Sequence, residues 1–222
     1  MMKEKIVRNN TRPECGTLFT EIVGVYSPHK AVAVLADTSD YMTGGTVRQF
    51  QAAFHSFVQD ICADPKISEE TDLSVITFSE VPESVKGWMP ARAWKEEELN
   101  LKTGGERNIK AAAGFAIQEL QKQARRYTLV GIQQKIPYIL MVTSLNEKEL
   151  QKLGRSIVRK MHGCEFRMGI LSPDPADRAS RVVLYNGKDL VKIKASSYKD
   201  FFEFFALVIQ DSFGDNQLKS GW

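Results

Sequence analysis

Short runs of apolar residues alternate with amphipathic segments along this chain. Residues 31–36, AVAVLA, are apolar throughout and partly β-branched, which predicts a strand buried on both faces of a parallel sheet. Between residues 46 and 62, apolar positions recur every three or four residues, which predicts an amphipathic helix. We expect the first segment to be the central strand and the aromatic stripe of the helix to belong to the core.

The same alternation continues to the end of the chain. A second helix is expected over residues 108–126 with Asn108 as its N-cap, and a last helix over 197–213. Asn146 and Glu149 resemble a capping pair, so another helix should begin there. Further strands are predicted over residues 73–79, 81–88, 136–144, 166–172 and 189–195. The strand at 81–88 follows its predecessor too closely for a helical crossover, so it should form an antiparallel edge hairpin.

This order of elements predicts the fold class. Strands alternating with helices of such length indicate a doubly wound α/β fold, here a six-stranded, mostly parallel sheet with one antiparallel edge strand and helices on both faces. Since no repeat or Pro/Gly-rich linker divides the chain, we expect one domain over residues 1–213. Residues 172–180 should form a surface loop, and residues 214–222 a disordered tail.

The composition excludes several classes of protein. With 222 residues and 43% hydrophobic content, the chain can bury a core without disulfides or a structural metal. A net charge of +3 is too small to indicate a nucleic-acid partner. Three cysteines without CxxC spacing favour a reducing compartment. The start of the chain has no signal-peptide pattern, and no apolar run could cross a bilayer, so we expect a cytoplasmic protein without a membrane partner.

Function in such a fold belongs to the loops at the carboxyl ends of the strands. The loop after the first strand, DTSDYMTGG, contains neither a dinucleotide-binding GxGxxG nor a phosphate-binding GxxxxGK[ST] pattern. It does place Asp37 and Ser39 two residues apart, where both can turn oxygen atoms toward a hard cation. The three histidines lie in separate elements and show no catalytic spacing, so a structural interpretation is favoured.

Five separated segments occur in an order that is similar to a known family. They are AVAVLADTSDYM, LSVITFS, KTGGERNIKAAAGFAI, YILMVTSLNEKEL and YKDFFEFFALVIQ. The chain thereby resembles the von Willebrand factor A (vWA) domains, and in particular the stand-alone bacterial proteins of the tellurium-resistance TerY type. The resemblance implies a Rossmann-like fold and a metal-ion-dependent adhesion site.

Carried over to this chain, the family's ligand positions are only partly kept. Asp37 and Ser39 match the first two ligands, whereas Tyr41, Glu106 and Ser144 stand where the family has Ser, Thr and Asp. The resemblance therefore implies a degenerate metal site at Asp37, Ser39, Glu106 and Ser144. Since Mg²⁺ demands near-octahedral oxygen ligands, a misplaced carboxylate compensates poorly. We expect no cofactor, with magnesium or manganese as the alternative.

Each of these residues also has a purely structural interpretation. Asp37 can cap its own loop by accepting backbone N–H bonds. Glu106 can pair with Arg107 or Arg48 at the surface. Gly104 and Gly105 can supply a turn before the helix. Trp88 and Trp94 suit either an exposed patch that anchors an interface or packing under a long loop.

Three functions remain open at this stage. The leading hypothesis is a non-catalytic protein-interaction module, which the resemblance places in a bacterial stress or tellurium-resistance type of assembly. Its partner would bind at a rim formed by Asp40, Tyr41, Thr43, Glu106, Arg107, Ser144 and Asn146. The second is a working Mg²⁺- or Mn²⁺-dependent adhesion domain. The third, an enzyme acting on nucleotides or phosphate esters, has only fold analogy in its favour.

Overall fold

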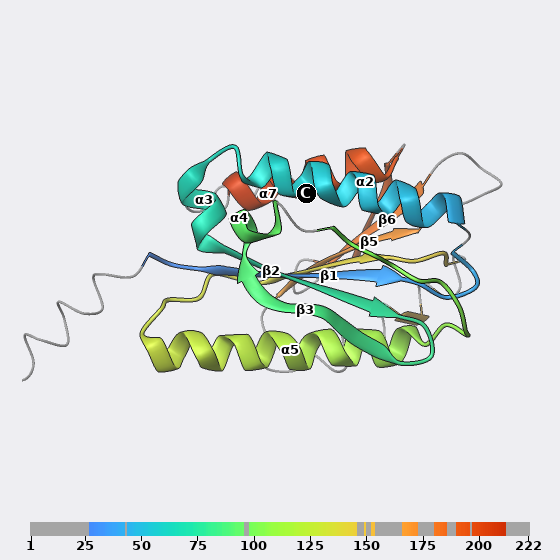
Figure 1. The fold of residues 1–222 in the computed structure, drawn as a ribbon, viewed down its shortest axis with the longest axis horizontal. Coiled ribbons are helices and arrows are strands. Elements are labelled where there is room, and N and C mark those ends of the chain that lie inside the picture. The colour runs from blue at the N-terminus through green and yellow to red at the C-terminus, as the bar shows by residue number, and fades with distance from the viewer. Residues whose placement is uncertain are drawn as a thin grey trace, which may run out of the picture.

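A mixed β-sheet forms the middle layer of the molecule (Figure 1). The computed structural model describes residues 27–42, 44–95, 98–145, 149, 152–153, 166–172, 180–185, 190–195 and 197–211. Within them the sheet has seven strands in the order β3-β2-β1-β4-β5-β6-β7. Their bounds are β1 (Lys30–Asp37), β2 (Thr71–Phe78), β3 (Pro82–Pro90), β4 (Tyr138–Val142), β5 (Arg167–Ser172), β6 (Ser180–Tyr185) and β7 (Leu190–Ala195).

The strand directions confirm part of the predicted sheet and correct the rest. β1 pairs in parallel with β2 and β4, and β4 pairs in parallel with β5. β3 is antiparallel to β2, as expected of the edge hairpin. The prediction of six strands with a single antiparallel strand was wrong, because β6 is antiparallel to both β5 and β7. β6 follows the expected loop at 172–180, whose residues 173–179 lie outside the described residues.

The missed strand had a recognisable signal in the sequence. The segment RVVLYNGKDLVKI contains two β-branched runs joined through Asn186 and Gly187, a pair that favours tight hairpin turns. We predicted only the second run as a strand. The hairpin of β6 and β7 extends the sheet on the side away from β3.

Helices lie above and below the sheet in the view of Figure 1. α2 (Gly44–Ile61) and α7 (Tyr198–Asp211) pack on one face, and α5 (Ile109–Val130) on the other. These three helices confirm the segments expected at 46–62, 197–213 and 108–126. Two short helices, α3 (Pro65–Glu70) and α4 (Ala91–Trp94), were not predicted. The helix expected after Asn146 lies outside the described residues, apart from Glu149, Lys152 and Leu153.

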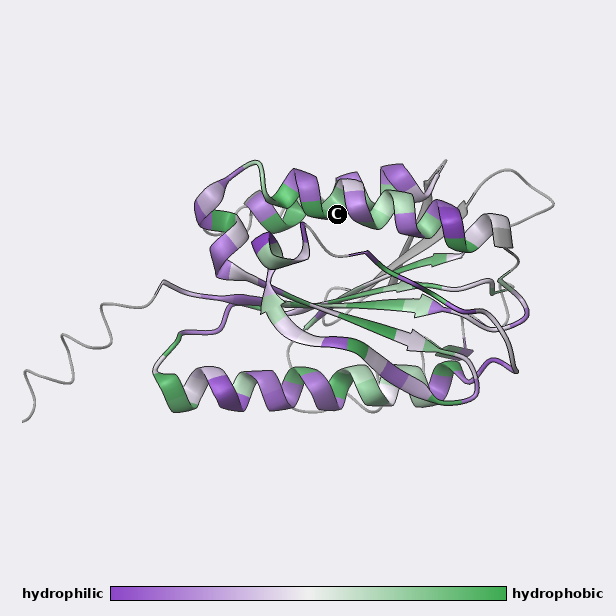
Figure 2. Ribbon diagram, in the orientation of Figure 1, coloured by the Kyte–Doolittle hydropathy of each residue, from purple (hydrophilic) through white to green (hydrophobic). Residues whose placement is uncertain are grey.

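Burial on both faces explains the continuous apolar run of β1. Every residue of this strand is buried. Val32, Val34 and Ala36 contribute to the core under α2 and α7, whereas the alternate residues contribute to the core above α5. Figure 2 shows the hydrophobic colour along the central strands and alternating colours along the helices. A strand between two helical layers has no polar face, so its sequence shows no alternation.

Aromatic side chains fill the core between the sheet and α2. Phe54 packs edge-on against Trp94 with ring centroids 5.7 Å apart, and Phe57 lies 5.2 Å from Phe202 of α7. Trp94 is 1% exposed, and its indole N–H donates to the Leu73 carbonyl oxygen at 3.1 Å. The packing interpretation of this tryptophan is therefore correct, and it does not belong to an exposed patch.

Strand β5 approaches α7 so closely that one position requires glycine. A Cβ atom on Gly169 would lie 2.2 Å from Cζ of Phe205. The aromatic residues of the helix therefore pack directly on the strand backbone.

No helix among the described residues has the length and apolar character needed to cross a membrane. Residues 1–26 and the expected tail at 214–222 lie outside the described residues.

Candidate binding site at the carboxyl edge of the sheet

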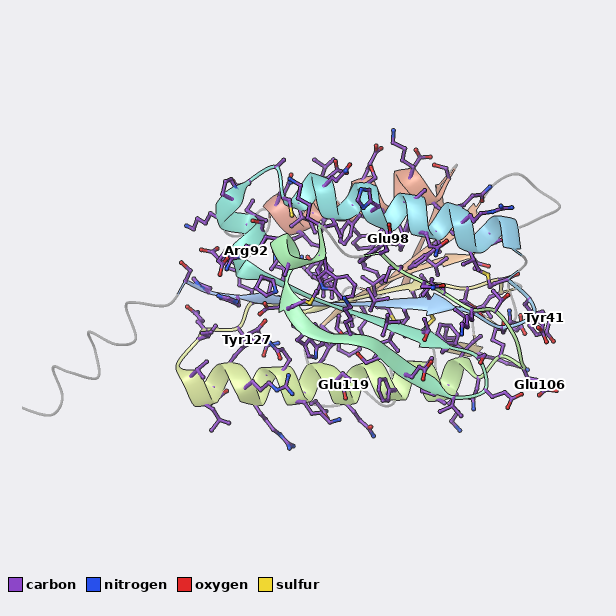
Figure 3. All side chains as sticks on the ribbon, viewed as in Figure 1. Tyr41, Arg92, Glu98, Glu106, Glu119 and Tyr127 are labelled. Atoms are coloured by element: carbon purple, nitrogen blue, oxygen red, sulfur yellow. The ribbon has the colours of Figure 1, made fainter. Side chains whose placement is uncertain are left out.

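Three loops meet where the parallel strands end. The Asp40 amide donates to the Gly105 carbonyl oxygen at 3.0 Å, and the Gly104 amide to that of Thr38 at 2.8 Å. The Thr143 hydroxyl at the end of β4 donates to Asp37 at 2.6 Å. These bonds join the loop after β1, the loop before α5 and the loop after β4. Figure 3 shows Tyr41 and Glu106 together at this end of the molecule, toward which the arrow of β1 points.

Asp37 is the centre of a buried hydrogen-bond network. Its side chain is 2% exposed. Oδ1 accepts from the Ser39 amide at 2.9 Å and from the Ser39 hydroxyl at 2.6 Å, while Oδ2 accepts from Thr143. Three donors satisfy the carboxylate, as a buried charge requires. The local capping interpretation of Asp37 thus accounts for the bond from the Ser39 amide, whereas the Thr143 hydroxyl is a donor that it did not include.

The two glycines before α5 shape the second loop. Gly105 has a φ of +83°, in the region that favours glycine, and a Cβ there would lie 3.2 Å from the Glu80 carboxylate. Asn108 then caps α5, because its side-chain oxygen accepts from the Ala111 amide at 3.1 Å. The turn and the cap confirm the structural interpretation of this segment. Residues 106 and 107 lie between them.

Arg107 joins the loop before α5 to the loop after β1 and to the segment after β4. Its guanidinium donates from Nη1 to the Ser144 carbonyl oxygen and from Nη2 to Glu149 Oε1, the latter at 3.0 Å. Its Cζ lies 4.5 Å from the ring centroid of Tyr41. The side chain is only 9% exposed. The expected pairing of Glu106 with Arg107 is therefore wrong: Arg107 pairs with Glu149, and the Glu106 side chain is exposed.

The donor set at this edge does not fit a divalent cation. Asp37 is the buried carboxylate of the network, and hydroxyl and amide donors occupy both of its oxygens. Glu106 is exposed, and the Ser144 carbonyl oxygen accepts from a guanidinium. In the part of the chain that the structure describes, no three His, Cys, Asp or Glu side chains are grouped to hold a metal ion. Magnesium would meet too few carboxylates and an arginine beside them.

The rim around this network carries an exposed aromatic side chain. Tyr41 is 63% exposed, although its ring rests on Arg107. Asp40 and Glu106 are exposed beside it, and Ser144 is half-buried. Of the other rim residues expected from the sequence, Thr43 and Asn146 lie outside the described residues.

A buried tyrosine from α7 lies under the same edge. Tyr198 is 6% exposed, and its hydroxyl lies close to the Thr46 side chain. Burial raises the pKa of Tyr198, and the negative charge of Asp37 adds to this effect, whereas the Thr46 side chain opposes it. The phenol therefore stays protonated at neutral pH. Tyr198 could not be singled out from the sequence, because the start of the last helix carries no motif.

A second polar cluster lies at the opposite end of the sheet, near the label of Tyr127 in Figure 3. His29 Nδ1 lies 3.1 Å from Asp72 Oδ2, to which the Tyr127 hydroxyl also donates. The hydrogen bond to Asp72 raises the pKa of His29. His55 contacts Gln59 at 2.9 Å, and His162 lies outside the described residues. His29 thus lies at the other end of the sheet from the candidate site, and His55 contacts a residue of its own helix.

Comparisons with known proteins bear on the fold. No family model and no curated protein matches the chain. The structure of the conserved hypothetical protein BatB from Bacteroides thetaiotaomicron is similar, with a TM-score of 0.51 and 12% identity over 84% of this chain and 100% of that chain. At this identity the likeness shows a shared fold alone.

Weaker matches include von Willebrand-type domains. They are the vWF domain of the type V pili tip protein Mfa5 from Porphyromonas gingivalis (TM-score 0.39, 12% identity, 55% of this chain) and the ArnB paralog VWA2 from Sulfolobus acidocaldarius (TM-score 0.39, 14% identity, 66% of this chain). The chain spans 39% and 34% of the lengths of those two chains. Likenesses this weak carry no argument about what the protein binds.

Proposed function

We propose that the chain is a vWA-type module that binds another protein at the rim formed by Asp40, Tyr41, Glu106, Arg107 and Ser144, and that it catalyses no reaction. The fold supports this proposal, because the loops at the carboxyl edge converge, as ligand-binding loops of open α/β sheets do. The resemblance of the sequence to the TerY type supports a bacterial stress or tellurium-resistance assembly in the cytoplasm as its setting.

One observation carries the proposal more than any other. Tyr41 is 63% exposed, yet its ring is held 4.5 Å from the Arg107 guanidinium. An exposed aromatic side chain held in one position loses little conformational freedom on binding and buries a large apolar area. Tyrosine and arginine are also the residue types that contribute most often to binding energy at protein interfaces.

The polar groups at the edge favour binding over catalysis. Asp37 is the strongest candidate for a general base, but hydroxyl and amide donors already engage both of its oxygens. Neither described histidine lies in the site, since His29 contacts Asp72 and His55 contacts Gln59. An acid–base mechanism needs a group within hydrogen-bond reach of a bound substrate.

Site-specific photo-crosslinking in the native host tests the rim. A benzophenone amino acid replaces Tyr41 in one variant and Leu129 in a matched control; Leu129 is 85% exposed at the far end of α5. We expect one discrete protein adduct from position 41 that is absent from position 129. Identical adduct patterns at the two positions, or no adduct from position 41, would contradict the proposal.

A further inference from the structure

Arg107 contacts two of the three substituted positions of the expected metal site. The Tyr41 ring, at the position where the resemblance implies a ligand serine, faces its guanidinium at 4.5 Å. The backbone oxygen of Ser144, at the position of the implied aspartate, accepts from its Nη1 atom. The third substituted position, Glu106, is its neighbour in the chain. Two of the three departures from the ligand pattern thus contact one largely buried cation of the chain itself.

We propose that the Arg107 guanidinium does for these loops what a divalent cation does in an intact adhesion site, and that the partner consequently binds without a divalent cation. The first half of the proposal concerns the chain alone, whereas the second half rests on the function proposed above. Arg107 is a positioning residue here: it holds Tyr41 and the loop after β4 in place rather than supplying the contact surface.

The chemistry of the surrounding groups matches a guanidinium better than a metal ion. A guanidinium offers N–H donors in its plane and a flat face for stacking, and it stays charged at every physiological pH. Arg107 uses the plane for Ser144 and Glu149 and lies against the ring of Tyr41. Magnesium takes oxygen ligands in an octahedron and gains little from an aromatic face. A tyrosine at a ligand position is thus compatible with an arginine and unfavourable for magnesium.

Partial burial strengthens the ion pair between Arg107 and Glu149. The Arg107 side chain is 9% exposed and that of Glu149 is 41% exposed, so solvent screens the pair only in part. The two residues are 42 positions apart in the chain, and the bond therefore fixes loops that are distant in sequence. Thr143 and Asp37 join two of the same loops through the Thr143 hydroxyl. The guanidinium adds the outer connection, next to the exposed rim.

Amide hydrogen exchange of the chain alone tests the first half. One protected amide reports on each loop: Asp40 bonded to Gly105, Gly104 bonded to Thr38, and Leu145 bonded to the Ser172 hydroxyl at 2.7 Å. In Arg107→Lys, which keeps the charge and loses the planar fork, we expect these amides to exchange about tenfold faster. The control Arg92→Lys alters an exposed pair with Glu69 and should leave them unchanged.

Tyr41→Leu provides a second test of the proposal if the Arg107 variant does not fold. Because Tyr41 is exposed, this change removes the stacking contact without disturbing the core. We expect faster exchange at Asp40 and unchanged exchange at Leu145. Exchange within about twofold of wild type at all three amides in both variants would overturn the proposal. So would a tenfold slowing in the wild-type chain on adding 10 mM MgCl2 or MnCl2 alone, since that result would make a metal ion the organising cation.

The second half is tested by repeating the position-41 crosslink in cell extract with 5 mM EDTA and with 10 mM MgCl2. Equal adduct yields in the two samples support binding without a divalent cation, and an adduct that EDTA abolishes overturns it. If no adduct forms in either sample, the function proposed above fails and the metal-independent binding with it. The exchange results on the chain alone then still decide whether Arg107 bridges the loops.

Discussion

The hydroxyl of Thr143 donates to Oδ2 of Asp37 at 2.6 Å, and it thereby joins two parallel strands whose residues are 106 positions apart in the chain. Both side chains are buried, with exposures of 0% for Thr143 and 2% for Asp37. A buried carboxylate that loses one donor keeps its desolvation cost without the compensating bond. The pair therefore offers a direct measurement of how much this network stabilises the edge of the sheet.

Thr143→Val replaces the hydroxyl with a methyl group of the same shape. We expect the free energy of unfolding to fall by about 1–3 kcal/mol, because Asp37 Oδ2 loses its donor. Urea titration at pH 7 measures the change, and Thr103→Val in the exposed loop should stay within about 0.5 kcal/mol of wild type. Equal effects at positions 103 and 143 would show that the Thr143–Asp37 bond contributes no net stability.

Gly169→Ala tests the close approach of α7 to β5. The new Cβ would lie 2.2 Å from the Phe205 ring, so helix and strand must separate, at a cost of about 1–3 kcal/mol or more. Gly87→Ala is the matched control in β3, since its Cβ meets nothing within 4 Å. In thermal melts, we expect a double variant Gly169→Ala/Phe205→Leu to be more stable than the sum of the single losses implies.

His29 should make the stability depend on pH near neutrality. Its pKa is raised above the ordinary 6.5, first by the hydrogen bond to Asp72 and then by the charges of Asp72, Glu70 and Glu69, against the opposing effect of burial. Stability from this charge is fully present below pH 6.5 and is lost as the pH rises through the raised folded-state value. His29→Gln should therefore destabilise the protein more at pH 5.5 than at pH 9. Equal losses at both values, measured by urea titration, would contradict this assignment.

Lys30 should act in the opposite direction and in a higher pH window. Burial, together with the charges of Lys135 and Arg167, lowers the pKa of Lys30 from 10.5 to about 7. Below pH 7 the folded state carries a poorly solvated charge, and between pH 7 and 10.5 unfolding takes up a proton, so stability rises with pH.

Lys30→Met is the variant that tests this assignment. Its stability relative to wild type should be less favourable at pH 9.5 than at pH 6 by roughly 3 kcal/mol. Comparing variant and wild type at the same pH cancels the contributions of the other titrating groups. The variant also loses the bond from Lys30 Nζ to the Ile209 carbonyl oxygen, and this loss adds the same amount to the difference at every pH. A difference between variant and wild type that does not change with pH would show that Lys30 titrates normally.

Local patterns were sufficient to predict the frame of this fold. Helical spacing of apolar residues identified α2, α5 and α7, because each helix buries one face. The unbroken apolar run identified β1, because this strand is buried on both faces. β6 was missed although Asn186 and Gly187 marked its hairpin. α3 was missed because its six residues are too few to show a helical period. Its start was still signalled by Asp64, whose side chain accepts from the Lys66 and Ile67 amides.

The candidate site was less predictable, since its contacts join distant segments. Asp37 and Ser39 are two residues apart, and their bond could be anticipated from local chemistry. Arg107 lies beside Glu106 in the sequence but pairs with Glu149, 42 residues away. The choice of ion-pair partner depends on how the loops pack, and no local pattern encodes it.

The position of β1 in the sheet also determines when the protein can fold. Its neighbours are β2, which begins 41 residues after β1 begins, and β4, which does not begin until Tyr138. During synthesis on the ribosome the AVAVLA segment therefore has one unpaired edge until most of the chain has been made. Fragments that end before residue 138 should aggregate, and the intact chain should refold slowly for its size.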